Sequence, residues 1–200
     1  TTSPAAGVKP PAPERERERV LGQDEIKAVW SAFGHLGYPY GPMFRLLLLT
    51  GQRRSEVAHM RWSEIDFGNA LWTLSGTRTK AGRLHEVPLS PQAVRLLEEL
   101  PRIGDFVFAT RADAPAVSFS SPKRRVDRWA ELPPWTLHDL RRTGASYMAW
   151  LGFAPSTIAH VLNHSEGGVT RIYNRYSYLK EKRQALDCWG AELERIVQGK

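Results

Sequence analysis

Cysteine is nearly absent from this chain: Cys188 stands alone among 200 residues, so no disulfide can form within it. A single thiol suits a reducing compartment, and we expect a cytoplasmic protein. Long apolar runs are also missing, because the longest, Phe44 to Leu49, contains Arg45 and is far too short to span a bilayer. No signal peptide is visible and the initiator methionine is missing, which indicates an excised fragment. We expect no membrane partner.

Clusters of metal ligands are scarce as well. The pair His138 and Asp139 is typical of metal phosphohydrolases, but no second paired histidine and aspartate accompanies it. The lone cysteine excludes a site built from several thiolates. We therefore expect neither a metal nor a cofactor.

Acidic residues are outnumbered by basic ones. The chain has 28 Lys and Arg against 21 Asp and Glu, a formal charge of +7 and a pI of about 9.8. This excess favours a polyanionic partner, although charge alone fits a merely basic protein equally well. A hydrophobic content of 42% with seven tryptophans is enough for one packed domain.

Residues 1–19 differ in composition from the rest. The first thirteen include four prolines and almost nothing to bury, and residues 14–19 alternate acid and base. We expect a flexible linker over 1–19, entering from a missing upstream domain, and a single folded domain over 20–200.

Helical periodicity covers most of the folded part. From Asp24, apolar residues follow the i, i+3, i+4, i+7 spacing at Ile26, Val29, Trp30 and Phe33. Pro42 suits the first turn of a buried helix through Leu49, which Gly51 interrupts. Further helices are expected over residues 55–60, 90–100, 156–162, 170–173 and 179–197, and from Ser121 and Thr136.

A shorter period appears between these helices. Residues 63–67, 71–74 and 85–89 are typical of short strands, with a turn at Gly68-Asn69 and a loop over 76–83. Residues 106–108 add a short extended piece. The predicted fold is mainly α (α+β), a helical bundle with a small three-stranded antiparallel sheet.

Two arginines, two histidines, one lysine and one tyrosine form the candidate catalytic set: Arg53, Lys80, His138, Arg141, His164 and Tyr173. The cationic and imidazole side chains can surround a phosphodiester with hydrogen-bond donors. The tyrosine hydroxyl can attack it, and nearby cations would lower its pKa from about 10. The sequence thus indicates phosphoryl transfer on DNA.

The segment LHDLR supplies two members of this set. Thr136 and Asp139 fit the first and last positions of a capping box, which places His138 and Arg141 on one face near the positive end of the helix dipole. The alternative is that the histidine only caps the helix and the arginine is an ordinary surface charge.

Arg53 follows the helix break at Gly51, where a guanidinium can face a groove and grip two phosphate oxygens. Glu56 can orient it, although a simple surface salt bridge between the two is the alternative. The loop GTRTKAG and its flank hold three basic candidates, Arg78, Lys80 and Arg83, and only a lysine readily donates a proton. A solvated basic loop is the alternative there.

His164 precedes Tyr173 by nine positions, with a glycine pair between them. Tyr176 and Tyr178 are rival nucleophiles, and each could equally be a core or interface aromatic. Other basic residues are expected to contact DNA phosphates, which positions the DNA without reading its sequence: Arg54, Lys123, Arg124, Arg125, Arg128 and Arg142. A solvated helix face is the alternative for these.

Together these segments resemble the catalytic domain of the tyrosine recombinases, the phage-integrase family. TGQRRSEVAHMRWSEID is similar to the first arginine motif, LHDLRRTGAS to the His-x-x-Arg box, and VLNHSEGGVTRIY to the histidine-to-tyrosine segment. The tail NRYSYLKEKRQALDCW is most similar to prophage and genomic-island integrases. The resemblance covers about Val20 to Lys200. Asn163 replaces a common glycine, yet asparagine tolerates a left-handed backbone.

The resemblance implies a role for each position. Arg53, Arg141 and His164 would hold the non-bridging oxygens of the transition state, and His138 would assist by hydrogen bonding or proton transfer. The resemblance also selects Lys80, which would protonate the departing 5′ oxygen. These roles require no metal.

Tyr173 would attack the phosphorus and stay joined to the 3′ phosphate, so that religation needs no ATP. The resemblance thus implies a site-specific recombinase that integrates or excises a mobile element. A type IB topoisomerase would use similar chemistry, and a non-catalytic DNA-binding module would keep only the groove.

Double-stranded DNA at attachment sites is the implied partner, with accessory DNA-bending proteins as further candidates. The C-terminal helix carries an apolar stripe at Leu186, Trp189, Leu193 and Ile196. This stripe either packs on its own core or docks onto a neighbouring protomer of a homotetramer on DNA, and the sequence leaves both open. The resemblance makes residues 20–200 the catalytic domain and the missing upstream domain a DNA-binding one.

Overall fold

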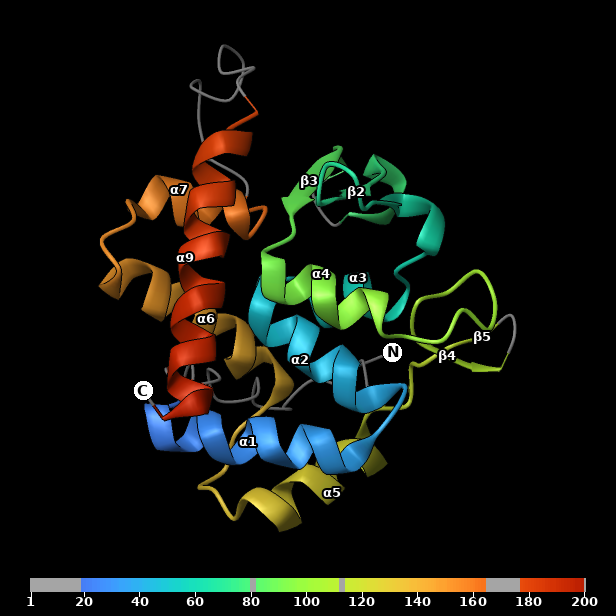
Figure 1. Cartoon of the computed structure of the whole chain (residues 1–200), viewed down its shortest axis with the longest axis vertical. Coiled ribbons are helices and arrows are strands. Elements are labelled where there is room, and N and C mark those ends of the chain that lie inside the picture. The colour runs from blue at the N-terminus through green and yellow to red at the C-terminus, as the bar shows by residue number, and fades with distance from the viewer. Residues whose placement is uncertain (1–18, 80–81, 112–113, 165–176, 200) are drawn as a thin grey trace, which may run out of the picture.

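Helices make up most of the computed structural model, which describes residues 19–79, 82–111, 114–164 and 177–199 (Figure 1). The expected helices are present, with ends shifted by a few residues, except the one expected over 170–173, which lies outside the described residues. The helices are α1 (Gln23–Leu36), α2 (Tyr40–Thr50), α3 (Arg54–Ala58), α4 (Pro91–Glu98), α5 (Ser120–Ala130), α6 (Leu137–Trp150), α7 (Pro155–Val161) and α9 (Leu179–Gln198).

Helix α2 is the centre of the core. Its residues 46–49 are all buried, because the helix contacts α1, α3, α4, α6 and α9 around its circumference. A helix that is apolar on every side is stable only when it is covered on every side. It ends at Gly51, which adopts the left-handed conformation (φ 63°) and donates its N–H to the carbonyl of Leu47 at 2.9 Å. The predicted break after α2 is therefore confirmed.

A small sheet lies at one end of the helical body, and α5 lies at the other (Figure 1). Strands β1 (Ile65–Asp66), β2 (Leu71–Leu74) and β3 (His85–Pro88) pair antiparallel in the order β1-β2-β3. This confirms the predicted three-stranded sheet. The first strand is shorter than expected, because residues 62–64 form a 3-10 turn in which Glu64 Oε2 accepts from the backbone N–H of Arg61 at 3.1 Å.

A second, two-stranded sheet was not expected. The extended piece expected over 106–108 contains one isolated bridge, between Phe106 and Arg61. The paired strands come just after it, as β4 (Ala109–Arg111) and β5 (Ala114–Pro115). These strands are too short to show the alternation of apolar and polar residues that predicts a strand from sequence.

The apolar stripe of α9 packs on its own core. Leu186, Trp189, Leu193 and Ile196 are each at most 1% exposed. The indole N–H of Trp189 donates to the carbonyl of Leu48 at 2.8 Å, which ties the C-terminal helix to the centre of α2. Of the two arrangements that the sequence left open, the structure has the intramolecular one. None of the helices within the described ranges is long and apolar enough to cross a membrane.

Replacing Trp189 with alanine is expected to lower the free energy of unfolding by about 3–5 kcal/mol, because the change leaves a cavity and an unpaired carbonyl. The matched control is Trp150→Ala, since Trp150 is 69% exposed on α6. Urea unfolding followed by circular dichroism measures both. Equal losses for the two variants would contradict the packing of the α9 stripe on the core.

Candidate active site

The turn between α2 and α3 holds Arg53 in a fixed pose. Glu56, one turn into α3, accepts from the backbone N–H of Arg53 through Oε2 and from Nη1 of the same residue through Oε1, both at 3.1 Å. Glu56 is almost fully buried, so its carboxylate is a rigid anchor. The expectation that Glu56 orients Arg53 is consistent with these contacts.

Arg141 comes from the second turn of α6. Its side chain reaches inward and the residue is only 5% exposed. Nη1 donates to the carbonyl of Gly51 at 2.7 Å and Nη2 to the carbonyl of Leu162 at 2.5 Å. Burial, followed by the charge of Arg53, lowers the pKa of Arg141 to about 10. The guanidinium is thus fixed between the end of α2 and the end of α7.

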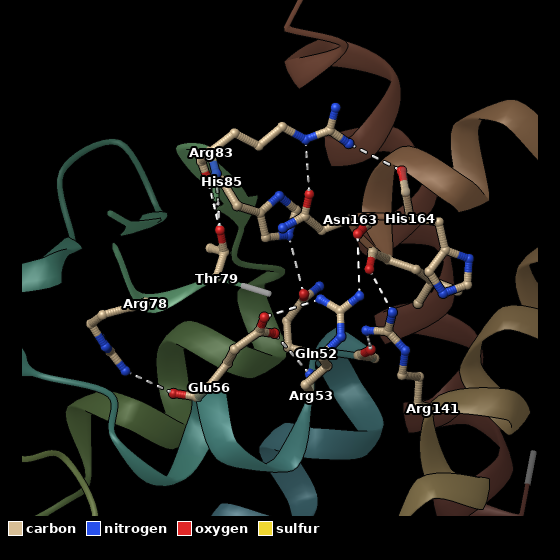
Figure 2. Close-up of polar contacts among 12 residues, drawn as sticks. Gln52, Arg53, Glu56, Arg78, Thr79, Arg83, His85, Arg141, Asn163 and His164 are labelled. Atoms are coloured by element: carbon tan, nitrogen blue, oxygen red, sulfur yellow. Dashed lines mark hydrogen bonds and ion pairs between the residues drawn. The ribbon is translucent and has the colours of Figure 1, made fainter. Parts of the chain in front are cut away.

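The two guanidiniums meet at consecutive carbonyls (Figure 2). Arg141 binds the carbonyl of Leu162, and Arg53 Nη2 donates to that of Asn163 at 3.3 Å. Asn163 has a left-handed backbone (φ 49°), as expected for an asparagine in place of glycine. His164 follows directly. One tight turn therefore gathers two arginines and a histidine that are far apart in sequence.

Both histidines of the set lie within the field of these arginines. The pKa of His164 is lowered by burial and then by Arg141 and Arg53. The pKa of His138 is lowered by burial and then by Arg142 and Arg141. Neutral imidazoles are therefore favoured at pH 7, and each can donate one hydrogen bond or accept one proton.

The helix start that carries His138 is built partly as predicted. The carboxylate of Asp139 accepts from the backbone N–H of Thr136 at 2.7 Å and from its hydroxyl at 2.9 Å. Asp139 is fully buried and also pairs with Arg142 Nη1 at 2.7 Å. The carboxylate of Asp139, more than the hydroxyl of Thr136, therefore caps the N-terminus of α6.

Two members of the candidate set, Lys80 and Tyr173, and the rival Tyr176 lie outside the described residues. The rival Tyr178 stacks on His160 at the start of α9, with ring centroids 3.7 Å apart. This contact is typical of a packed aromatic. The described part of the site therefore contains Arg53, His138, Arg141 and His164 of the candidate set and leaves the nucleophile a prediction.

The rivals of Lys80 have other partners (Figure 2). Arg78 forms an ion pair with Glu64 and donates to the carbonyl of Glu56 at 3.2 Å. Arg83 Nε donates to Asn163 Oδ1 at 3.3 Å, and Nη2 donates to the carbonyl of His164 at 3.0 Å. Arg83 thus connects the loop before β3 to the turn that gathers the arginines.

Two buried polar residues beside the site, Gln52 and His85, were not singled out from the sequence. His85 Nε2 lies 3.1 Å from Gln52 Oε1. Burial and then the charge of Lys182, followed by three arginines, lower the pKa of His85 to about 3. The available signal was the alternation of β3, in which His85 shares the inward face with the apolar Val87.

The residues expected to contact DNA come from three helices. Arg54 on α3 lies over the ring of Phe119 at 4.5 Å, and Arg142 on α6 pairs with buried Asp139. On α5, Lys123 pairs with Asp127 at 2.5 Å. The remaining three members of this set point outward from α5: Arg124, Arg125 and Arg128. Helix α5, which carries these three exposed arginines, lies at the far end of the molecule from the sheet (Figure 1).

Comparison with known proteins supplies the family. Over residues 19–180 the chain matches the model of the phage integrase family. The chain belongs to the phage integrase family. Its catalytic-domain fold is that of the tyrosine recombinases, as the motifs predicted.

The chain matches only part of the length of its curated relatives in the phage integrase family. It is 32% identical over 180 residues to prophage integrase IntZ of Escherichia coli, covering 88% of this chain and 45% of the relative. It is also 32% identical over 152 residues to prophage integrase IntA of the same bacterium, covering 74% and 37%. The chain therefore spans less than half the length of these relatives.

Solved integrases share the fold. The integrase from mycobacterium phage Brujita superimposes with a TM-score of 0.67 at 16% identity, covering 93% of this chain and 63% of that one. The catalytic domain of bacteriophage HP1 integrase superimposes with a TM-score of 0.57 at 23% identity, covering 90% and 93%. The predicted fold class is confirmed.

The depressed pKa of His85 predicts a loss of stability in acid. Between the unfolded value of 6.5 and the folded value of about 3, the unfolded chain binds a proton that the folded chain excludes, so stability falls as pH decreases through this range. From pH 6.5 to pH 5 the loss is expected to be about 1–2 kcal/mol. Urea unfolding should show that His85→Gln loses less over this interval. Parallel pH slopes would contradict a neutral buried imidazole.

Proposed function

We propose that this chain is the catalytic domain of a site-specific tyrosine recombinase. It cleaves and rejoins DNA through a covalent 3′-phosphotyrosyl intermediate during integration or excision of a mobile element. The observation that carries the proposal is the meeting of Arg53 and Arg141 at the carbonyls just before His164. Two fixed guanidiniums with a neutral imidazole beside them are suited to hold a phosphate anion.

Each side chain then has one chemical task. Arg53, Arg141 and His164 donate hydrogen bonds to the non-bridging oxygens as negative charge grows on them. The oxygen of Tyr173 attacks phosphorus while its proton passes to the neutral imidazole of His138. The bond from phosphorus to the 5′ oxygen breaks, and Lys80 gives that oxygen a proton. Attack by a 5′ hydroxyl reverses the sequence, so the phosphodiester is restored without ATP.

Double-stranded DNA is the proposed partner, because the outward arginines of α5 can contact its phosphates. We propose a homotetramer on attachment sites, with accessory DNA-bending proteins as further partners. The apolar stripe of α9 is already buried, so protomer contacts through this helix would use its outward face. Residues 1–19 are proposed to link this domain to an upstream DNA-binding domain.

Tyr173→Phe is expected to abolish the covalent adduct while leaving DNA affinity within about twofold, because only the attacking oxygen is lost. A nicked suicide substrate followed by a denaturing gel detects the adduct, and peptide mapping locates it. Tyr178→Phe is the matched control and should retain the adduct, since Tyr178 stacks on His160. An adduct that persists in Tyr173→Phe, or maps to Tyr176, would show that the nucleophile is misassigned.

Cleavage is expected to proceed unchanged in EDTA, because side-chain cations supply the charge that a metal would otherwise provide. Single-turnover adduct formation with EDTA and with Mg²⁺ tests this. A strict requirement for a divalent ion would contradict the assigned roles. Salt-sensitive binding without any adduct would instead indicate a DNA-binding module, and relaxation of supercoils without strand exchange would indicate a topoisomerase.

A further inference from the structure

Gln52 makes an unusually complete set of contacts for a side chain that is only 1% exposed. Its amide nitrogen donates to the carbonyl of Thr50 at 3.0 Å and to that of Val161 at 2.8 Å. Both acceptors are carbonyls, so the amide nitrogen must face them and Oε1 must face His85 at 3.1 Å. The orientation of the amide follows from its partners.

This orientation also fixes the tautomer of His85. Because Gln52 Oε1 can only accept, the imidazole must carry its proton on Nε2 and donate. Four positively charged side chains from different segments lower the pKa of the ring: Lys182 on α9, Arg141 on α6, Arg53 on the α2–α3 turn and Arg83 before β3. A second proton on the ring would place a fifth positive charge among them. The pair is therefore a neutral hydrogen-bonded unit within a cationic cluster.

The pair joins the three segments that border the proposed phosphate site (Figure 2). Gln52 directly precedes Arg53. Val161 closes α7 just before Leu162 and Asn163, whose carbonyls hold the two arginines. His85 begins β3, at the base of the loop that carries Lys80. A displacement of Gln52 and His85 would shift these three segments relative to one another.

We propose that Gln52 and His85 act together as positioning residues, holding the arginine turn, the end of α7 and the base of the Lys80 loop in the arrangement needed for cleavage. The inference rests on the proposed function. Neither residue touches the phosphate in this scheme. An error of about 1 Å in the placement of reacting groups costs on the order of 100-fold in rate, so the effect should appear in the chemical step.

The test measures single-turnover adduct formation at saturating suicide substrate, beside DNA affinity and thermal unfolding. Gln52→Leu removes all three hydrogen bonds at similar volume and is expected to slow adduct formation about 10- to 100-fold, with DNA affinity within about twofold. The matched control is Gln92→Leu, which removes a hydrogen bond of 2.8 Å between α4 and Glu194 on α9. It should cleave at the unaltered rate.

His85 provides a second, independent variant pair. His85→Leu removes the donor and is expected to be as slow as Gln52→Leu, whereas His85→Gln can place an N–H near the position of Nε2 and should recover most of the rate. The double variant Gln52→Leu/His85→Leu should be hardly slower than either single one, because both disrupt the same unit.

Unaltered rates in both leucine variants would overturn the inference while leaving the proposed function intact. A second result would also overturn it: cleavage that slows only in proportion to a loss of DNA affinity or stability and that His85→Gln does not restore. That result would indicate that the pair has a purely structural role. Absence of an adduct with the unaltered chain would overturn the proposed function and this inference together.

Discussion

The candidate site depends on one geometric constraint: two positively charged guanidiniums must lie side by side in a largely buried place. Arg141 and Arg53 are held there by the carbonyls of Leu162 and Asn163, and Arg141 also by that of Gly51. Carbonyl dipoles hold Arg141 without neutralising its charge, whereas Arg53 also pairs with Glu56 at 3.1 Å. A carboxylate placed between the two guanidiniums would relieve the repulsion but would compete with an incoming anion. The positive charge between the two guanidiniums is therefore not cancelled by a carboxylate placed there.

The acidic residues near the two arginines are buried and do not lie between the guanidiniums. Glu56 is buried beneath Arg53, and Asp139 is buried at the start of α6, where it pairs with Arg142. Gln52 and His85, whose side chains lie 3.1 Å apart, adjoin the arginine turn without adding charge. The hydrogen bonds of Gln52 join this turn to Val161 and His85 and so limit its movement. In the proposed reaction, a rigid turn would favour preorganised binding of the developing oxyanion.

Much of this was predictable because its signals are local. The apolar residues of α2 end at Gly51, and the segment LHDLR begins a helix with an acid in its first turn; both features follow from backbone chemistry within a few residues. The family resemblance further selected six side chains by motif. The second small sheet and the hydrogen bonds of Gln52 were beyond such reasoning. Val161, one acceptor of the Gln52 amide, lies 109 positions along the chain, and β4 and β5 are too short for a period to emerge.

The sequence by itself determined the mainly α fold with its three-stranded sheet, the basic character and the identity of the candidate catalytic residues, because periodicity, charge and motifs are properties of neighbouring residues. Only the tertiary structure decided that the stripe of α9 packs on its own core, and that Arg83 and His85 adjoin the site. It also decided that consecutive carbonyls hold both arginines. These outcomes depend on which distant segments meet, and that is set by packing around α2.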